Sequence, residues 1–241
     1  MMLPRQRQHQ RRVALLPCDR GLPDAPLCVV MDLDETLVTA RRECVYPRPH
    51  VRELLDTCHA EGCEVVVWSA GSPLHVNNVI RVIAEVAQRR DWYHHIISRH
   101  RRWYRDDNEM VKDLSALGRP LNRVLLLENS PQLILQQPGH VVLVEDYVRP
   151  TVHDDSLRIF AGVVRRVAAG MRGASDEATP DVPRLLAADA ALINLSFPSS
   201  HPSAAEGVLC CRGITYSPQN VFALRSYGGM HPLPAEKMRD A

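Results

Sequence analysis

Short apolar runs alternate with longer amphipathic stretches between residues 27 and 169. Four mainly apolar runs of four or five residues predict buried strands over residues 27–31, 64–68, 124–127 and 141–144. Apolar residues recurring every three or four positions predict helices over residues 49–61, 74–88 and 154–169, and a short helical piece over 111–117. Gly62 and Gly170 follow the first and last of the long helices, so we expect each glycine to end its helix.

Strands made of unbroken apolar residues are typical of parallel sheets that are covered on both faces. Their alternation with helices predicts an α/β fold with a doubly wound, mostly parallel sheet. The pattern places the folded domain at residues 26–172, after a basic arm at residues 1–25 that we expect to be flexible. Residues 173–241 lose the pattern and contain recurring prolines, which predicts an irregular extension with little independent core. Within it, residues 185–195 are compatible with one helix.

The composition narrows the class of protein. A net charge of +1 gives no reason to expect direct binding to nucleic acid or to a membrane. The seven cysteines, an odd number without a zinc-type C-x-x-C pair, fit a reduced intracellular protein. We see no apolar run of transmembrane length and no secretory signal. We therefore expect the nucleus or cytoplasm, while the arginine-rich N-terminus leaves a mitochondrial location open.

Acidic, hydroxyl and amide side chains follow three of the predicted strands. Asp32 and Asp34 follow the first strand, Ser69 follows the second, and Glu128 and Asn129 follow the third. Taken singly, these residues have structural alternatives, such as a helix cap for the two aspartates and a turn for the last pair. Ligands of doubly wound sheets bind beyond the carboxyl ends of the strands. Three strands that deliver such residues to one edge therefore predict a functional site.

The two aspartates suit phosphoryl transfer. Carboxylates two residues apart in an extended chain point the same way, so Asp32 and Asp34 can face one phosphate. One carboxylate can attack phosphorus, and the other can protonate the leaving oxygen and then deprotonate water. Two acids repel a phosphate, and Mg²⁺, which prefers oxygen ligands, would offset their charge. The candidate ligands are Asp32, Asp34 through its backbone carbonyl, Asn129 and Glu128.

Two further residues could contact the phosphate. Ser69 can donate its hydroxyl to a phosphoryl oxygen, and Lys112 can supply positive charge to the phosphate and to Asp32. Only Lys112 and Lys237 are lysines among the 29 basic residues. A lysine within a motif therefore carries more weight here than in a lysine-rich chain. A turn serine and a surface lysine are the alternatives.

These motifs resemble the haloacid dehalogenase superfamily, and within it the small phosphatases that act on the C-terminal domain of RNA polymerase II, including the NLI-interacting-factor and Dullard-like members. The resemblance rests on D-L-D-E-T-L-V at 32–38, Y-P-R-P at 46–49, W-S-A at 68–70, M-V-K-D-L at 110–114, L-G-R at 117–119 and R-V-L-L-L-E-N-S-P at 123–131. It implies Asp32 as nucleophile, Asp34 as acid and base, Ser69 and Lys112 as phosphate contacts, and Asn129 as a magnesium ligand.

The sequence departs from the family pattern at several positions. Ser69 replaces the usual threonine and keeps its hydroxyl. Glu128 replaces the usual aspartate, and its additional methylene could move the carboxylate by more than about 1 Å. Relatives specific for the polymerase carry a longer insertion where this chain has only residues 39–45, and that insertion helps to form an apolar pocket for the peptide. The chemistry is therefore better predicted than the substrate.

The segment before the lysine motif, residues 98–105, is rich in arginine. The family often places an arginine near the phosphate in this segment, and Arg99 and Arg101 are the candidates. With Ala70, they form the predicted substrate-binding set, and they could steer an acidic phosphopeptide towards the site. A solvated basic loop is the alternative.

Three functions are compatible with these observations. The first is a monomeric phosphatase for phosphoserine or phosphothreonine in a protein substrate. The second is a phosphatase for a small phosphorylated metabolite, but such enzymes usually carry a cap domain, and residues 38–49 leave no room for one. The third is a binding subunit similar to the receptor of the mitochondrial import translocase, many of whose members lack the aspartate pair. Because this chain keeps both aspartates, catalysis is the preferred hypothesis.

Overall fold

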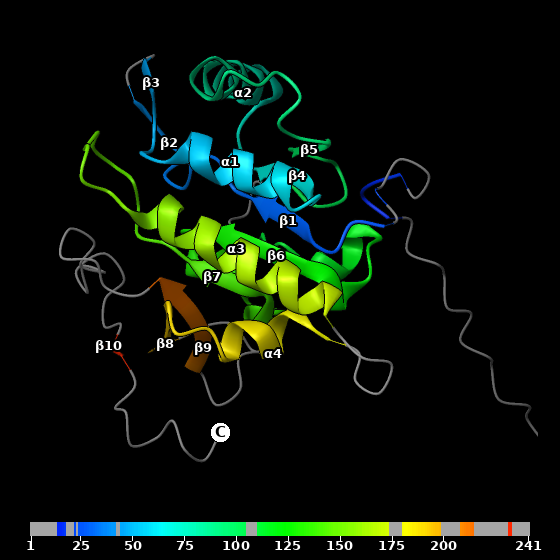
Figure 1. Ribbon diagram of the computed structural model, residues 1–241. Coiled ribbons are helices and arrows are strands. Elements are labelled where there is room, and N and C mark those ends of the chain that lie inside the picture. The colour runs from blue at the N-terminus through cyan, green and yellow to red at the C-terminus, as the bar shows by residue number, and fades with distance from the viewer. Residues whose placement is uncertain are drawn as a thin grey trace, which may run out of the picture.

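A mostly parallel sheet forms the centre of the molecule, and α1 and α3 lie side by side along one of its faces (Figure 1). The computed structural model describes residues 14–17, 22, 24–41, 44–104, 110–173, 180–198, 208–214 and 231–232. The strands are β1 (Cys28–Met31), β2 (Val38–Arg41), β3 (Cys44–Pro47), β4 (Glu64–Ser69), β5 (His95–Ser98), β6 (Val124–Glu128), β7 (Val141–Leu143), β8 (Leu192–Pro198), β9 (Val208–Ile214) and β10 (His231–Pro232). The α-helices are α1 (Val51–Ala60), α2 (Pro73–Ala87), α3 (Ser156–Arg172) and α4 (Val182–Ala187). The short 3₁₀ helices are η2 (Leu114–Leu117), η3 (Leu121–Arg123), η4 (Pro131–Ile134) and η5 (Pro138–His140).

The strand order in the main sheet is β10-β8-β9-β7-β6-β1-β4-β5. β1 pairs in parallel with both β4 and β6, and β5, β7 and β9 continue the parallel arrangement outwards. The antiparallel pairs among these strands are β8 with β9 and β10 with β8. The α/β fold class with a mostly parallel sheet, predicted from the apolar runs, is confirmed.

The strand register brings three carboxyl ends to the same level. Met31 of β1 is opposite Val67 of β4 on one side and Leu127 of β6 on the other. The residues that follow these positions therefore emerge together at one edge of the sheet. In this way the topology turns three separate strand-end motifs into neighbours.

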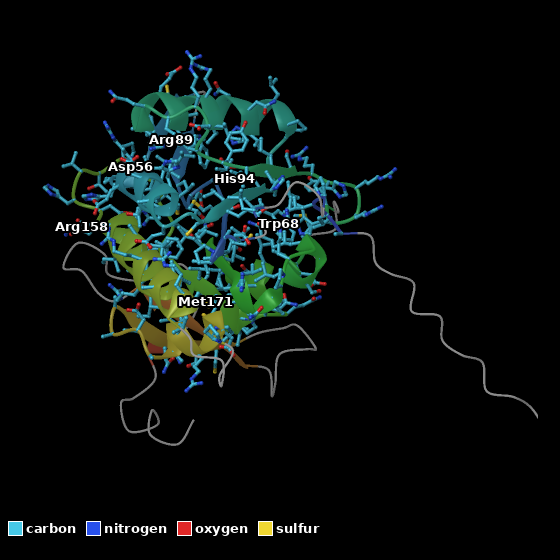
Figure 2. The ribbon with its side chains drawn as sticks, turned by 45° about the vertical axis from the view of Figure 1, so that its right-hand side comes forward. Asp56, Trp68, Arg89, His94, Arg158 and Met171 are labelled. Atoms are coloured by element: carbon cyan, nitrogen blue, oxygen red, sulfur yellow. The ribbon has the colours of Figure 1, made fainter. Side chains whose placement is uncertain are left out.

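Alternate strand residues pack into two separate cores, one on each face of the sheet. Val29, Met31 and their counterparts on neighbouring strands pack against α1, α2 and α3. Val30, Trp68 and their counterparts pack on the other face, which is covered by η2, η4 and the loop that carries Trp103. Side chains fill both layers, and Trp68 lies in the interior of the molecule (Figure 2). The sheet is thus buried on both sides, as continuous apolar strands require.

Several elements differ from the sequence-based prediction. The strand β5 and the β2–β3 hairpin were not predicted, and only residues 114–117 of the expected 111–117 piece are helical. Gly170 does not end its helix but lies inside α3. A Cβ at Gly170 would come within 2.8 Å of Leu185 Cδ2, so this glycine allows α4 to pack closely against α3.

The expectation of one helix over residues 185–195 is wrong. The helix α4 ends at Ala187, and β8 begins at Leu192. Asp189 separates the two elements, because its Oδ1 accepts the backbone N–H of Ala191 at 2.9 Å and its backbone oxygen accepts that of Leu192 at 3.1 Å. This local side-chain turn competes with continuation of the helix.

The sheet continues beyond residue 172, the predicted boundary of the folded domain. β9 pairs with β7 in parallel, and β8 pairs with β9 along seven residue pairs. Leu195, Leu209 and Cys211 are buried in the core on the far side of the sheet from α1 and α3. The described part of the extension therefore shares the core of the preceding residues.

The predicted N-terminal arm is described only in part. Residues 14–17 pack on the domain, where the Leu15 amide donates to the Ala116 carbonyl at 2.7 Å and Leu16 is buried. Residues 1–13, to which the flexible arm and a targeting signal were mainly assigned, lie outside the described residues. Within the described part of the chain, the helices are all too short or too polar to cross a membrane.

Candidate active site

The loop after β1 curls so that several polar side chains face the same sheet edge. The backbone N–H groups of Leu37 and Val38 both donate to the Leu33 carbonyl, at 2.8 and 3.1 Å. Glu35 takes a left-handed conformation with φ of 62°, which only a minority of non-glycine residues adopt. Leu33 and Leu37 are fully buried, and they anchor the loop in the core. The polar residues between them are left facing the edge.

The side chain of Arg48 also holds this loop in place. This fully buried residue donates to the Thr36 carbonyl at 3.1 Å, to Asp154 Oδ2 at 2.9 Å and to Ser156 Oγ at 3.1 Å. The guanidinium therefore ties the loop to the start of α3. Its pairing with Asp154 offsets the cost of burying its charge.

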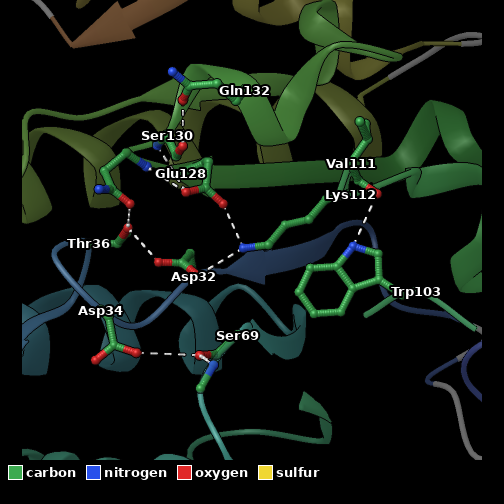
Figure 3. Close-up of polar contacts among 12 residues, drawn as sticks. Asp32, Asp34, Thr36, Ser69, Trp103, Val111, Lys112, Glu128, Ser130 and Gln132 are labelled. Atoms are coloured by element: carbon green, nitrogen blue, oxygen red, sulfur yellow. Dashed lines mark hydrogen bonds and ion pairs between the residues drawn. The ribbon is translucent and has the colours of Figure 1, made fainter. Parts of the chain in front are cut away.

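A buried ion triad joins Asp32, Lys112 and Glu128 (Figure 3). Lys112 Nζ lies 2.8 Å from Asp32 Oδ1 and 2.6 Å from Glu128 Oε2. Burial lowers the pKa of Lys112, but the negative charges of Asp32 and Glu128 outweigh it and raise the pKa above its usual value. The two carboxylates therefore favour the charged form of Lys112 beside Asp32.

Glu128 lies where the sequence placed it but faces Lys112. Its Oε2 pairs with Lys112, while its Oε1 accepts the backbone N–H groups of Asn129 and Ser130, both at 3.0 Å. Burial raises the pKa of Glu128 to about 7, and the charge of Asp32 adds to the rise, which Lys112 opposes. Both oxygens of Glu128 thus accept from Lys112 or from backbone N–H groups, and its expected role as a metal ligand stays a prediction.

The predicted metal ligands Asp32 and Asn129 meet at the hydroxyl of Thr36. Thr36 Oγ1 lies 3.0 Å from Asp32 Oδ2 and 2.9 Å from Asn129 Oδ1. A hydroxyl has one proton, so it can satisfy only one of these two acceptor oxygens at a time. Asp146 Oδ1 accepts from Asn129 Nδ2 at 2.8 Å, which leaves the amide oxygen of Asn129 facing the Thr36 hydroxyl.

This donor set fits Mg²⁺. No cluster of three or more His, Cys, Asp or Glu side chains with metal-site geometry occurs among the described residues. The candidate set instead combines one carboxylate with one amide oxygen and the backbone carbonyl of Asp34, and Mg²⁺ commonly completes such partial oxygen sets with water. The residues that would hold the ion are Asp32, Asn129 and Asp34.

Asp34 lies at the mouth of the site, between Ser69 and His75. Ser69 Oγ is 3.5 Å from Asp34 Oδ2, and His75 Nε2 is 2.7 Å from Asp34 Oδ1. Ser69 also accepts the backbone N–H of Gly71 at 2.9 Å, which fixes the buried hydroxyl at the end of β4. The structure thus brings Asp32, Asp34 and Ser69 to one sheet edge.

The predicted substrate-binding residues lie beside β5. Arg99 is exposed, and its Nε donates to the Ala70 carbonyl at 2.9 Å, next to Ser69. Its guanidinium also lies over the ring of Tyr104, 4.8 Å from the centroid. Arg101 is exposed on the following turn. The structure therefore brings Arg99 and Ala70 together next to the site, while residues 105–109 lie outside the described part.

Sequence reasoning did not single out Thr36, His75 or Asp146. Thr36 lies inside the D-L-D-E-T motif, so its position two residues beyond Asp34 was a usable signal. Asn129 immediately follows β6, and Asp146 lies in the segment after β7, three residues beyond Leu143, so the end of this fourth strand was also a usable signal. His75 lies on α2, and no sequence pattern connected it to Asp34.

A comparison with models of known protein families identifies the family of this chain. The family model described as NLI interacting factor-like phosphatase matches residues 27–174, more than half of the chain. The chain belongs to this family. The resemblance inferred from the motifs, to the haloacid dehalogenase superfamily and its small phosphatases, is confirmed.

Curated relatives share this part of the chain. The human carboxy-terminal domain RNA polymerase II polypeptide A small phosphatase 1 is 32% identical over 154 residues, which cover 55% of this chain and 56% of that protein. The yeast phosphatase PSR1 of Saccharomyces cerevisiae is 27% identical over 163 residues, or 59% and 36% of the two chains. The mitochondrial import inner membrane translocase subunit TIM50 of Yarrowia lipolytica is 27% identical over 139 residues, or 55% and 29%.

The matches span only part of these relatives. Among the first five, the match covers 36% to 61% of the relative's length. The solved structure of Fcp1, described as an essential RNA polymerase II CTD phosphatase, aligns with a TM-score of 0.36 and 14% identity over 65% of this chain and 56% of that one.

Proposed function

We propose that this protein is a Mg²⁺-dependent phosphatase that removes phosphate from phosphoserine or phosphothreonine in a protein substrate through an aspartyl-phosphate on Asp32. The observation that carries the proposal is the buried Lys112, which holds Asp32 at 2.8 Å at the sheet edge where Asp34 and Asn129 also lie. A carboxylate paired with a lysine ammonium group can accept the approach of a phosphate dianion. Membership of a phosphatase family supports the same reading.

The reaction would proceed in two steps. In the first, an oxygen of Asp32 bonds to phosphorus, the bond between phosphorus and the ester oxygen breaks, and Asp34 gives its proton to that oxygen. In the second, water attacks phosphorus, Asp34 takes a proton from the water, and the bond to Asp32 breaks to release inorganic phosphate. Asp34 is suited to this exchange because its side chain is 38% exposed, whereas that of Asp32 is only 10% exposed.

Other groups stabilise the charge of the transferred phosphoryl group. Lys112 supplies positive charge next to Asp32, and Ser69 offers a hydroxyl from the end of β4. Mg²⁺ held by Asp32, Asn129 and the Asp34 carbonyl would offset the charge on the phosphoryl oxygens. Arg99, beside Ala70, would attract the phosphorylated segment to the mouth of the site.

The choice of a protein substrate rests on the exposure of Asp34 and on the short segment between the aspartate loop and α1. The β2–β3 hairpin, Val38–Arg41 and Cys44–Pro47, is all that separates the aspartate loop from α1. A small metabolite has little surface to exclude water from such a site, whereas a polypeptide brings its own cover. The human relative whose name refers to RNA polymerase II suggests a similar phosphoprotein substrate for this chain.

The test is hydrolysis of p-nitrophenyl phosphate and of phosphoserine peptides by the purified chain with Mg²⁺. Asp32→Asn should lower kcat by about 10³-fold or more, because it removes the covalent nucleophile. Asp56→Asn, on the exposed side of α1, is the matched control and should keep the wild-type rate. An inactive wild type, or an Asp32→Asn variant with a normal rate, would exclude the catalytic proposal and favour a binding role similar to that of an import receptor.

A further inference from the structure

His75 makes the closest contact to the side chain of Asp34 among the hydrogen bonds of the described residues. The distance from His75 Nε2 to Asp34 Oδ1 is 2.7 Å, whereas the contact from Ser69 Oγ to Asp34 Oδ2 is 3.5 Å. Hydrogen bonds to carboxylates are strong near 2.8 Å and weak at 3.5 Å. An ionised carboxylate can only accept, so Nε2 donates its proton in this contact. The conformation of Asp34 is thus set mainly by His75.

The backbone around His75 is built to hold the imidazole in this position. Ser72 is the N-cap of α2, and its Oγ accepts the His75 backbone N–H at 3.3 Å. Pro73 occupies the first turn, where its fixed φ favours the start of a helix. His75 therefore lies in the first turn of α2, which begins immediately after the Ser69 segment and points its side chain at the aspartate loop.

Gly71 supplies the space for the ring. A Cβ at Gly71 would lie 2.8 Å from His75 Cδ2 and 3.1 Å from Ser69 Oγ. Carbon atoms that are not bonded do not approach to 2.8 Å, so a side chain at residue 71 would displace the imidazole, and it would also crowd the serine hydroxyl. The absence of a side chain at residue 71 thus leaves room for Ser69 and His75 to lie together against Asp34.

The contact divides the tasks of the two oxygens of Asp34. Oδ1 accepts from His75, so a proton to be transferred is left to Oδ2, which faces Ser69 at the end of β4. The Asp34 side chain is 38% exposed, so neighbouring atoms do not enclose it on every side and packing alone does not fix its orientation. A directional hydrogen bond is the simplest means of keeping one oxygen aimed at the phosphate.

We propose that His75 is a positioning residue for the acid/base Asp34, which it orients so that Oδ2 protonates the leaving oxygen as the bond from phosphorus breaks. The inference rests on the proposed phosphatase function and deepens it. His75 touches neither the phosphate nor Asp32 in this role. It acts through Asp34, and the same orientation serves when Asp34 takes the proton of the attacking water.

If His75 orients Asp34, its loss should affect substrates differently according to their leaving groups. A purely structural role for His75 predicts no such difference. The side-chain oxygen of serine is a poor leaving group that needs a proton as its bond to phosphorus breaks, whereas 2,4-dinitrophenolate leaves without one. A variant that misdirects Asp34 should therefore lose activity on poor leaving groups and keep it on good ones. A folding defect or weaker phosphate binding would instead lower the rate on every substrate by one common factor.

The experiment compares His75→Leu, which removes the N–H, with His75→Gln, whose amide can donate from a similar position. We would measure kcat/KM for 2,4-dinitrophenyl phosphate, p-nitrophenyl phosphate, phenyl phosphate and a phosphoserine peptide. The matched control is His59→Leu, at an exposed position on α1. Circular dichroism and thermal unfolding of each variant would accompany the rates.

We expect His75→Leu to lose about tenfold or more on phenyl phosphate and on the phosphoserine peptide, a part of the 10²- to 10⁴-fold typical of general acid catalysis. Its loss on 2,4-dinitrophenyl phosphate should stay within about threefold, and His75→Gln should recover much of the difference. Equal losses on all four substrates, unchanged rates, or a glutamine variant no better than leucine would overturn the proposal. A wild type without activity would instead remove the proposed function itself, so the two failures are distinguishable.

Discussion

Lys112 Nζ lies 2.8 Å from Asp32 Oδ1, and this ion pair joins two residues that are 80 positions apart in the chain. The Lys112 side chain is fully buried and that of Asp32 is 10% exposed. Burial of opposite charges at this distance is stable only while both remain. The pair therefore links the conformation of the lysine segment to that of the aspartate loop, and its loss should affect both folding and activity.

Replacement of Lys112 by methionine should be strongly destabilising. The variant leaves the carboxylates of Asp32 and Glu128 buried together without their cation, which typically costs about 3–5 kcal/mol. Urea unfolding monitored by tryptophan fluorescence would measure the change. Arg81→Met, which breaks an exposed ion pair with Glu85, is the control and should cost less than about 1 kcal/mol. Similar losses in both variants would contradict the buried triad.

The pair of Arg48 and Asp154 should make folding stability depend on acidic pH. Burial raises the pKa of Asp154, but the charge of Arg48 outweighs it, and the pKa is lowered from its ordinary value. A carboxyl whose pKa is lower in the folded state stabilises the fold above its unfolded pKa, about 3.9, and this stabilisation is lost as the pH falls through the folded value.

The variant Asp154→Asn separates this contribution from general acid unfolding. At pH 7 it should be less stable than wild type by about 3–5 kcal/mol, because Arg48 is then buried without its partner. The difference should shrink as the pH falls below 4, and urea unfolding at a series of pH values would follow it. A difference that stays constant or grows at low pH would contradict the assigned pair.

Asp146 should control magnesium affinity through Asn129. Asp146 Oδ1 accepts from Asn129 Nδ2, so Asp146→Ala frees the amide to rotate its oxygen away from the ion. Loss of such a supporting partner typically weakens metal binding by about 10- to 100-fold. Calorimetric titration with Mg²⁺ in the absence of substrate measures this directly. Glu85→Ala, at an exposed position on α2, should bind as wild type does, and an unchanged affinity in Asp146→Ala would refute the assignment.

The strands of the C-terminal extension should contribute to global stability. Leu209 and Cys210 are neighbours in β9, but Leu209 is buried in the core and Cys210 is exposed. Leu209→Ala should cost about 2–5 kcal/mol, the usual range for a buried leucine. Cys210→Ala should change stability by less than about 0.5 kcal/mol. Thermal or urea unfolding would show whether β9 is integral to the sheet, and equal small effects would indicate that it is not.

Local sequence patterns were sufficient for the central part of the fold. Continuous apolar runs identified β1, β4, β6 and β7, because strands buried on both faces cannot carry polar residues in their interior. The same runs located the carboxyl ends at which ligands bind in such sheets, and so they pointed to Asp32, Ser69 and Asn129. The chemistry was readable because it depends on residue types placed immediately after a strand.

The sequence pattern did not predict the strands outside this centre, and the reason is physical. β8 begins inside the stretch predicted as a helix at residues 185–195, and both β8 and β9 mix buried with half-buried or exposed positions, so neither forms a continuous apolar run. The turn at Asp189 and the interior position of Gly170 depend on contacts with Ala191 and Leu185. Such contacts form only when the chain is folded.

The sequence by itself determined the type of sheet, the edge that carries the site and the residue types available there. The tertiary structure decided their partners. It paired Glu128 with Lys112, placed the Asp146 carboxylate against the Asn129 amide and brought His75 to Asp34. The reason is that local patterns follow from the burial of neighbouring residues, whereas the pairing of distant side chains depends on register, helix placement and the space that Gly71 leaves open.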